Sequence, residues 1–259
     1  MLAVALAGLA AGSINAVVGS GTLVTFPVLL AVGLPPVTAT VSNSLGLVPG
    51  NLTGAIGYRR ELAGQRRLLV RLFPASVLGA LTGAFLLLHL PASAFETVVP
   101  GLVALAVLLV AVQPLLQRWL AARRARAGTA APDTTARLGR GRLAALFAGA
   151  YATGTYGGYF AASQGVLQIG LFGLLLPHSL QQLNAIKNVL TLAVNAVAAV
   201  TYIVVATGRV DWPAAGLVAV GSLVGGWLGS RFGRRLPAVV LRTAIVALGL
   251  VAIAVLVTR

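Results

Sequence analysis

The chain has 259 residues, of which 58 % are hydrophobic and only 9 % are charged. Soluble domains carry about 25 % charged residues, so this composition indicates a membrane protein with no long soluble domain. The net charge of +15 would favour nucleic-acid binding in a soluble chain. Here the arginines stand in short clusters between apolar runs, as in the loops of multi-pass membrane proteins, so we expect no nucleic-acid partner. Because the chain has no cysteine, disulfides and thiolate chemistry are excluded.

The first half of the chain alternates apolar runs with short breaks. Residues 2–18 form an apolar run that ends in the glycine-containing break 19–22. A second run, 23–32, is too short to cross a bilayer, which takes roughly 20 residues. It ends at the sequence GLPP (33–36), which must terminate a helix. Three longer runs follow: an unusually polar one at 37–58, closed by an arginine cluster, and plainer spans at 72–90 and 95–116.

The second half repeats this order after a polar, arginine-rich segment at 118–142, which we interpret as a flexible linker. An apolar run at 143–160 is followed by a break at 163–165 and a short run at 166–176. A helix bearing asparagines and a lysine then extends to about Ala206. Two further spans are expected at 213–229 and 241–258.

The two halves also match residue by residue. SGTLVTF (20–26) aligns with SQGVLQI (163–169) with one residue of slippage, and VSNSLG (41–46) aligns with IKNVLT (186–191). In that register Asn43 corresponds to Asn188, and Ser42 corresponds to Lys187. We therefore predict a first transmembrane repeat at 1–117, a basic cytoplasmic linker at 118–142 and a second repeat at 143–259, within one integral membrane domain.

The arginines predict the orientation of the repeats. Placing the clusters at 59–71, 118–142 and 231–242 in the cytoplasm leaves only Arg209 and Arg259 outside. Each half then makes an odd number of crossings, so the halves have opposite orientation, and both chain ends are expected outside. We predict an all-α fold: a polytopic transmembrane helical bundle of two inverted-topology repeats, with broken or short helices near the midplane, as in secondary transporters. Its location would be the cell membrane.

The stretch 183–200 holds the most informative residue of the chain. Lys187 is the single lysine, and Asn184, Asn188 and Asn195 lie near it on one helical face. A cation in hydrocarbon is costly, so it is expected to face the bundle interior and bind an anion. The alternative is a lysine that extends to the membrane interface.

Both breaks add hydrogen-bond donors to this cation. Glycines at a break let backbone N–H groups point into a cavity, and a helix that begins there presents its positive end. Helix packing is the alternative role for such small residues. The predicted substrate-binding residues are Lys187, Asn188, Asn43, Ser20, Gly21, Thr22, Ser163, Gln164 and Gly165.

The positions of the acidic residues limit the transport and catalytic chemistry that we expect. Glu61, Glu96, Asp133 and Asp211 all fall in loops or at span ends, so cation-pump chemistry is not expected. No metal-ligand spacing and no nucleophile–base pair is present, so we expect neither an enzyme nor a metal site nor a cofactor.

Three segments carry a family resemblance: AGSINAVVGSGTLVTFPVLLAVGLPP (11–36), ATVSNSLGLVPGNLTGAIGYRR (39–60) and NAIKNVLTLAVNAVAAVTYIVVATGRVDW (184–212). They resemble the TauE/SafE sulfite exporter family of membrane transporters over nearly the whole chain. The resemblance implies transport of small sulfur-containing anions such as sulfite, thiosulfate or organosulfonates, among them sulfoacetate.

We therefore expect a transporter that exports or exchanges such anions across the lipid bilayer by alternating access. Two alternatives stay open: a passive anion channel on the same scaffold, and a non-transporting membrane subunit that binds a partner through its basic loops. The sequence also leaves the oligomeric state open, a homo-oligomer included.

Overall fold

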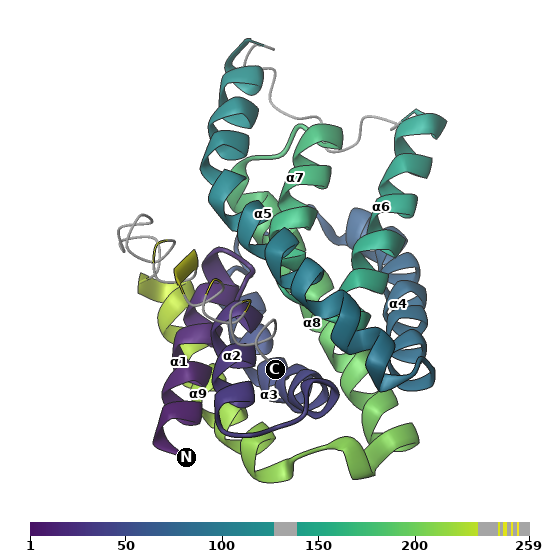
Figure 1. Cartoon of the computed structure of the whole chain (residues 1–259). Helices are drawn as coiled ribbons and strands as arrows, with labels where there is room; N and C mark the ends of the chain where they lie inside the picture. Colours follow the sequence, from purple (N-terminus) through teal and green to yellow (C-terminus); the bar gives the residue numbers. More distant parts are fainter. Residues whose placement is uncertain (127–138, 233–242, 244–245, 248–249, 251–252, 254–259) are drawn as a thin grey trace.

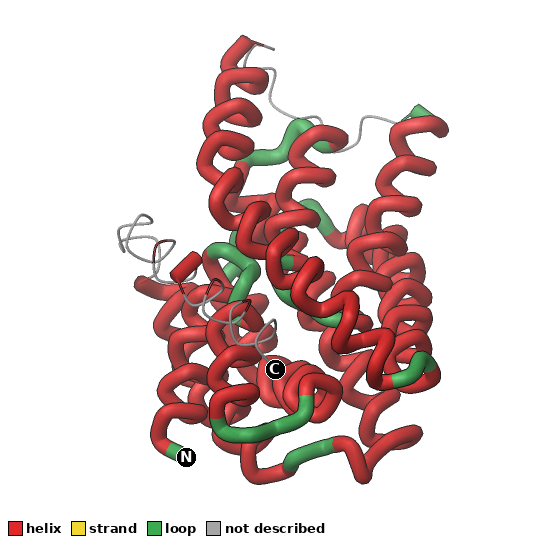
Figure 2. The backbone as a smooth tube through the Cα atoms, in the orientation of Figure 1, coloured by secondary structure: helices red, strands yellow, loops and turns green. Residues whose placement is uncertain are grey.

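The protein is seen in a computed structural model that describes residues 1–126 and 139–232, with five single positions beyond them. Within this part of the chain every regular element is a helix (Figure 2). In chain order these are α1 (Leu2–Val17), α2 (Thr22–Ala31), α3 (Pro36–Gly57), α4 (Arg66–His89), α5 (Ala92–Arg126), α6 (Arg140–Tyr159), α7 (Gln164–Leu175), α8 (Leu180–Ala206), the 3-10 turn η1 (Thr207–Arg209) and α9 (Trp212–Phe232).

Helix length and hydropathy confirm a multi-pass membrane protein. Four helices, α4, α5, α8 and α9, are long and apolar enough to cross a bilayer. The more polar α3 has 22 residues, which at 1.5 Å per residue also reaches roughly 30 Å. Exposed valines and leucines such as Val204, Val220 and Leu115 cover the outside of the bundle, as expected for side chains that face lipid.

Local sequence explains where the helices begin and end. Pro36 occupies the first turn of α3, where its missing N–H costs nothing. Ser179 and Gln182 form a capping box that starts α8. Gly19 and Gly33 have φ values of +87° and +95°, a left-handed conformation that glycine adopts most easily. They interrupt the chain after α1 and after α2, so that each helix stays short.

Two helical hairpins, α1–α2 and α6–α7, enter the bundle from opposite ends, and their tips are the breaks between the two helices of each pair (Figure 1). The loop between α2 and α3 lies near the start of the chain. The loop between α7 and α8 lies toward the other end, where α5 finishes and α6 starts. Hydrogen bonds agree with this arrangement, because the α7–α8 loop contacts the α3–α4 loop through His178 Nε2 and Gln65 Oε1, 2.6 Å apart. At the opposite end, Arg209 donates to Leu88 O at 3.2 Å.

The packing of the two halves is reciprocal. Helix α1 packs along α9, and α6 packs along α4; likewise α3 contacts α9, and α8 contacts α4. Small residues allow both close approaches: a Cβ on Gly12 would lie 2.8 Å from Ser222 Cα, and one on Gly158 would lie 2.9 Å from Ala80 Cα. Exchanging the first four helices with α6–α9 preserves these pairs, which is compatible with two inverted repeats.

Three boundaries differ from expectation or cannot be compared. Helix α5 continues to Arg126, so the first part of the expected linker 118–142 is helical. The second break ends two residues earlier than predicted, because α7 already begins at Gln164. The expected final span, 241–258, lies almost entirely outside the described residues.

Candidate functional site

The tips of the two hairpins meet inside the bundle. Gly165 N donates a hydrogen bond to Gly19 O at 3.2 Å. A Cβ on either glycine would lie 2.6 Å from the Cα of the other, closer than real side chains approach. Contact between the two breaks therefore requires glycine on both sides. It also brings the N-terminal ends of α2 and α7 to one place, the geometry that favours an anion.

Lys187 lies beside this contact and is 1 % exposed. A Cβ on Gly165 would meet Lys187 Cδ at 2.7 Å, so the lysine stem passes directly along the second break. Its Nζ donates to Asn15 O at 2.9 Å and to Ala16 O at 3.4 Å. These carbonyls belong to the last turn of α1, whose negative end favours a cation.

Asn188 binds the same helix end. Its Nδ2 donates to Ala16 O at 3.2 Å, so Lys187 and Asn188 together satisfy carbonyls that the end of α1 leaves without helical partners. The lysine therefore faces the bundle interior, and its backbone contacts account for two of its three donor positions. One N–H of the ammonium group remains for a further partner.

Asn43 joins α3 to α2 through side chains. Thr25 Oγ1 donates to Asn43 Oδ1, and Asn43 Nδ2 donates to Thr22 Oγ1 at 3.1 Å. The second half has a comparable link, in which Thr191 Oγ1 of α8 donates to Gln168 Oε1 of α7 at 3.1 Å. Each short helix is thus fixed to the following helix by a polar contact.

Ser163 has a structural partner of its own. The residue adopts a left-handed backbone conformation with φ of +59°, and its Oγ donates to Ala106 O of α5 at 3.1 Å. This bond holds the second break against α5, so Ser163 is less available to a ligand than the sequence suggested.

Two of the predicted residues have buried polar atoms without protein partners. Ser20 is 0 % exposed and Gln164 is 1 % exposed. Neither Ser20 Oγ nor the Gln164 Oε1 and Nε2 atoms make a hydrogen bond. Leaving such a group unpaired costs about 1–3 kcal/mol, and a ligand or water commonly accounts for it. These atoms are the strongest indication that the hairpin tips form a binding site.

Sequence reasoning missed one residue that organises the first break. Asn15 Oδ1 accepts from Gly21 N at 3.2 Å, and Asn15 Nδ2 donates to Asn51 Oδ1 at 2.7 Å. An asparagine inside the apolar run 2–18 was the available signal, since polar groups buried in a membrane bundle need partners. Gly21 therefore acts through its backbone, in contact with α1 and not facing open space.

The described acidic residues lie in loops or near helix ends and not at the hairpin tips. Glu61 lies in the α3–α4 loop, Glu96 near the start of α5 and Asp211 just before α9. Across the described ranges, no group of three His, Asp or Glu side chains is placed to hold a metal ion. The tips combine hydroxyl and amide donors, two helix N-terminal ends and one ammonium group.

A multi-pass bundle with two short hairpins that enter from opposite ends and meet near its centre is typical of membrane transporters. Comparison with known proteins agrees. The chain belongs to the sulfite exporter TauE/SafE family, whose model matches residues 4–256.

Relatives in two bacterial species carry corresponding names. The probable membrane transporter protein YfcA of Escherichia coli strain K12 is 29 % identical over 230 residues, covering 87 % of this chain and 76 % of the relative. A probable membrane transporter protein of Haemophilus influenzae is 30 % identical over 96 residues, covering 37 % and 38 %. No solved structure shows a significant match.

Proposed function

We propose that this membrane transporter moves small sulfur-containing anions, such as sulfite, thiosulfate or organosulfonates including sulfoacetate, by alternating access. The observation that carries the proposal is the pair of unpartnered, buried side chains, Ser20 and Gln164, one at each hairpin tip. A sulfur oxyanion presents several acceptor oxygens, which suit a hydroxyl, a carboxamide N–H and an ammonium N–H. The family's description as sulfite exporters supports this substrate class.

In this proposal Lys187 provides the positive charge, and the first turns of α2 and α7 add their dipoles. Asn43, Asn188, Thr22 and Ser163 keep the surrounding helices in register through their own hydrogen bonds. Gly21 and Gly165 allow the tips to pack closely against α1 and against Gly19. Access would alternate because each hairpin belongs to one half of the chain, and rocking of the halves would open the tips to one side at a time.

The test is anion flux into proteoliposomes that contain the purified protein. We would measure sulfite, thiosulfate, sulfoacetate and sulfate, with and without a pH gradient. Saturable flux of one sulfur anion is expected in the natural protein. It should fall at least tenfold in Lys187→Gln, because loss of one charge-assisted hydrogen bond costs roughly 1.5–3 kcal/mol.

Arg60→Gln is the matched control, because it removes the same charge from an exposed loop residue. Its flux should equal that of the natural protein. Unchanged flux in a folded Lys187→Gln variant would remove Lys187 from the site. Single-channel currents would instead support a passive anion channel. Absence of flux for every anion would favour a subunit that binds a partner through its basic loops.

A further inference from the structure

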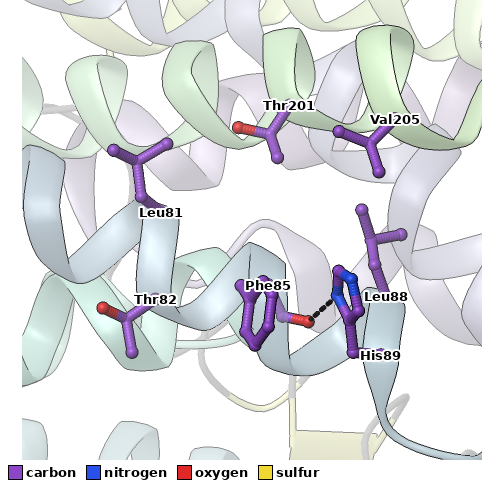
Figure 3. A pocket seen from close by; sticks show the side chains of 7 residues that line it. All are labelled: Leu81, Thr82, Phe85, Leu88, His89, Thr201 and Val205. Atoms are coloured by element: carbon purple, nitrogen blue, oxygen red, sulfur yellow. Dashed lines mark hydrogen bonds between the residues drawn. The ribbon is translucent and has the colours of Figure 1, made fainter.

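A groove of about 390 Å³ lies between α4 and α8, away from the hairpin tips. Figure 3 shows Thr201 and Val205 of α8 on one wall, opposite the side chains of α4. The residues that line it are Leu81, Thr82, Phe85, Leu88, His89, Thr201 and Val205. None of the predicted substrate-binding residues is among them.

The walls of the groove are apolar despite the two threonines. Thr82 Oγ1 donates to Leu78 O at 2.9 Å, and Thr201 Oγ1 donates to Val197 O at 2.8 Å. Each hydroxyl is therefore engaged by its own helix. Phe85 is 56 % exposed and Val205 is 59 % exposed, so the groove opens on the outside of the bundle. Both helices are membrane spans, which places this opening against lipid.

One end of the groove is polar and cationic. His89, the last residue of α4, stacks on Phe85 with ring centroids 3.9 Å apart and places Nδ1 3.0 Å from Phe85 O. The exposed Arg209 donates to Leu88 O at the same helix end. Asp211 lies nearby, but its Oδ1 accepts from Ala214 N at 2.8 Å at the start of α9. The eight-residue step from Leu81 to His89 spans roughly 12 Å, from the hydrocarbon to the end of the span.

We propose that this groove binds one phospholipid with an anionic headgroup. An acyl chain would lie against Leu81, Phe85 and Val205, and the phosphate would lie at His89 and Arg209. The apolar walls and the cationic end match the two parts of such a lipid. A guanidinium group pairs with phosphate in a planar, two-point geometry, whereas a zwitterionic headgroup offers Arg209 less net attraction.

The experiment is native mass spectrometry of the purified full chain, titrated with phosphatidylglycerol or phosphatidylcholine of identical acyl chains. The natural protein should retain one phosphatidylglycerol more tightly than phosphatidylcholine. Arg209→Gln should weaken phosphatidylglycerol binding about fivefold and leave phosphatidylcholine unchanged. Val205→Trp, which fills the groove, should abolish retention of both lipids.

Val204→Trp is the matched control, because Val204 is 77 % exposed and lies outside the groove; it should retain lipid normally. Equal retention of the two lipids by the natural protein would overturn the proposal, as would normal phosphatidylglycerol binding in Val205→Trp. Release of phosphatidylglycerol by added sulfite would also overturn it and assign the groove to the transported anion. Should Val205→Trp fail to fold, Arg209→Gln decides the question alone.

Discussion

At the scale of single residues, Gln164 is the most unusual side chain in the described part of the protein. Its carboxamide is buried, yet both its oxygen and its nitrogen lack hydrogen-bond partners. Gly157 leaves room for it, since a Cβ there would lie 2.7 Å from Gln164 Nε2. An unpaired buried carboxamide is costly, so we propose that a bound ligand or water supplies its missing hydrogen bonds.

We predict that Gln164→Leu stabilises the protein and impairs its function. Leucine has a similar volume and brings no unpaired polar atoms, so the free energy of unfolding should rise by about 1–3 kcal/mol. Thermal unfolding measured with and without sulfite would check this. The variant should unfold at a higher temperature in the absence of the anion, and it should lose the stabilisation that the anion gives the natural protein.

Gln168→Leu is the control for this change, one helical turn further along α7. Gln168 accepts a hydrogen bond from Thr191, so its loss should lower stability while the response to sulfite persists. A Gln164→Leu variant that is less stable than the natural protein would show that the carboxamide has partners of its own.

At the scale of elements, the break after α1 depends on one glycine for two separate reasons. Gly19 has a positive φ, and it faces Gly165 at backbone distance. Gly33 shares only the first property, because nothing lies within 4 Å of a Cβ placed there. Substitutions at the two positions therefore distinguish the cost of backbone strain from the cost of lost contact between the helices.

We predict that Gly33→Ala costs only left-handed strain, about 1–2 kcal/mol, and leaves anion flux intact. Gly19→Ala should cost roughly 1–3 kcal/mol more, because the new methyl group forces the hairpin tips apart, and flux should be lost. Thermal unfolding and proteoliposome flux of both variants would check this. Equal losses in the two variants would mean that the contact between the tips contributes nothing.

The elements themselves were largely predictable from sequence. Hydropathy runs and breakers indicated both short helices, the polar α3 and the end of α8 at Ala206, which the structure confirms. The predicted end of the span 95–116, at Leu116, was wrong. Helix α5 continues to Arg126, because the segment after Leu116 is rich in alanine and arginine. These are strong helix formers whose charge we read as a linker.

The site was harder to predict than the helices. The interior position of Lys187 followed from the cost of a membrane-buried cation. Its partners did not, since they are backbone carbonyls 172 and 171 residues earlier, which no side-chain pattern reveals. The bond from Ser163 to Ala106 O was hidden for the same reason. The roles of all nine predicted residues in substrate binding stay predictions.

At the scale of the whole molecule, the orientation of the two hairpins can be tested directly, because the chain has no cysteine. Single cysteines at the exposed positions Arg60 and Gln181 should react with a membrane-impermeant maleimide only from the cytoplasmic side. Cysteines at the exposed Val32 and Gly208 should react only from outside. Labelling of intact cells and of inverted vesicles would measure this.

Labelling of Val32→Cys and Gln181→Cys from the same side would contradict opposite entry of the hairpins, and with it the inverted relation of the halves. Arg60→Cys and Gly208→Cys serve as references. Arg60 follows the end of α3 on the expected cytoplasmic side, and Gly208 follows the end of α8 on the expected outer side.

The bond between Lys187 and the end of α1 also bears on how the protein is made. Lys187 lies in the first third of α8, and a lysine inside a membrane helix opposes insertion, by up to about 2.5–3.5 kcal/mol at the helix centre. Its partners belong to the first helix of the chain. Proteins are synthesised from the N-terminus, so α1 reaches the bilayer long before α8. The carbonyls that solvate the ammonium are then already in place when α8 leaves the ribosome. The order of helices along the chain thus supplies intramolecular acceptors for the single lysine of the sequence.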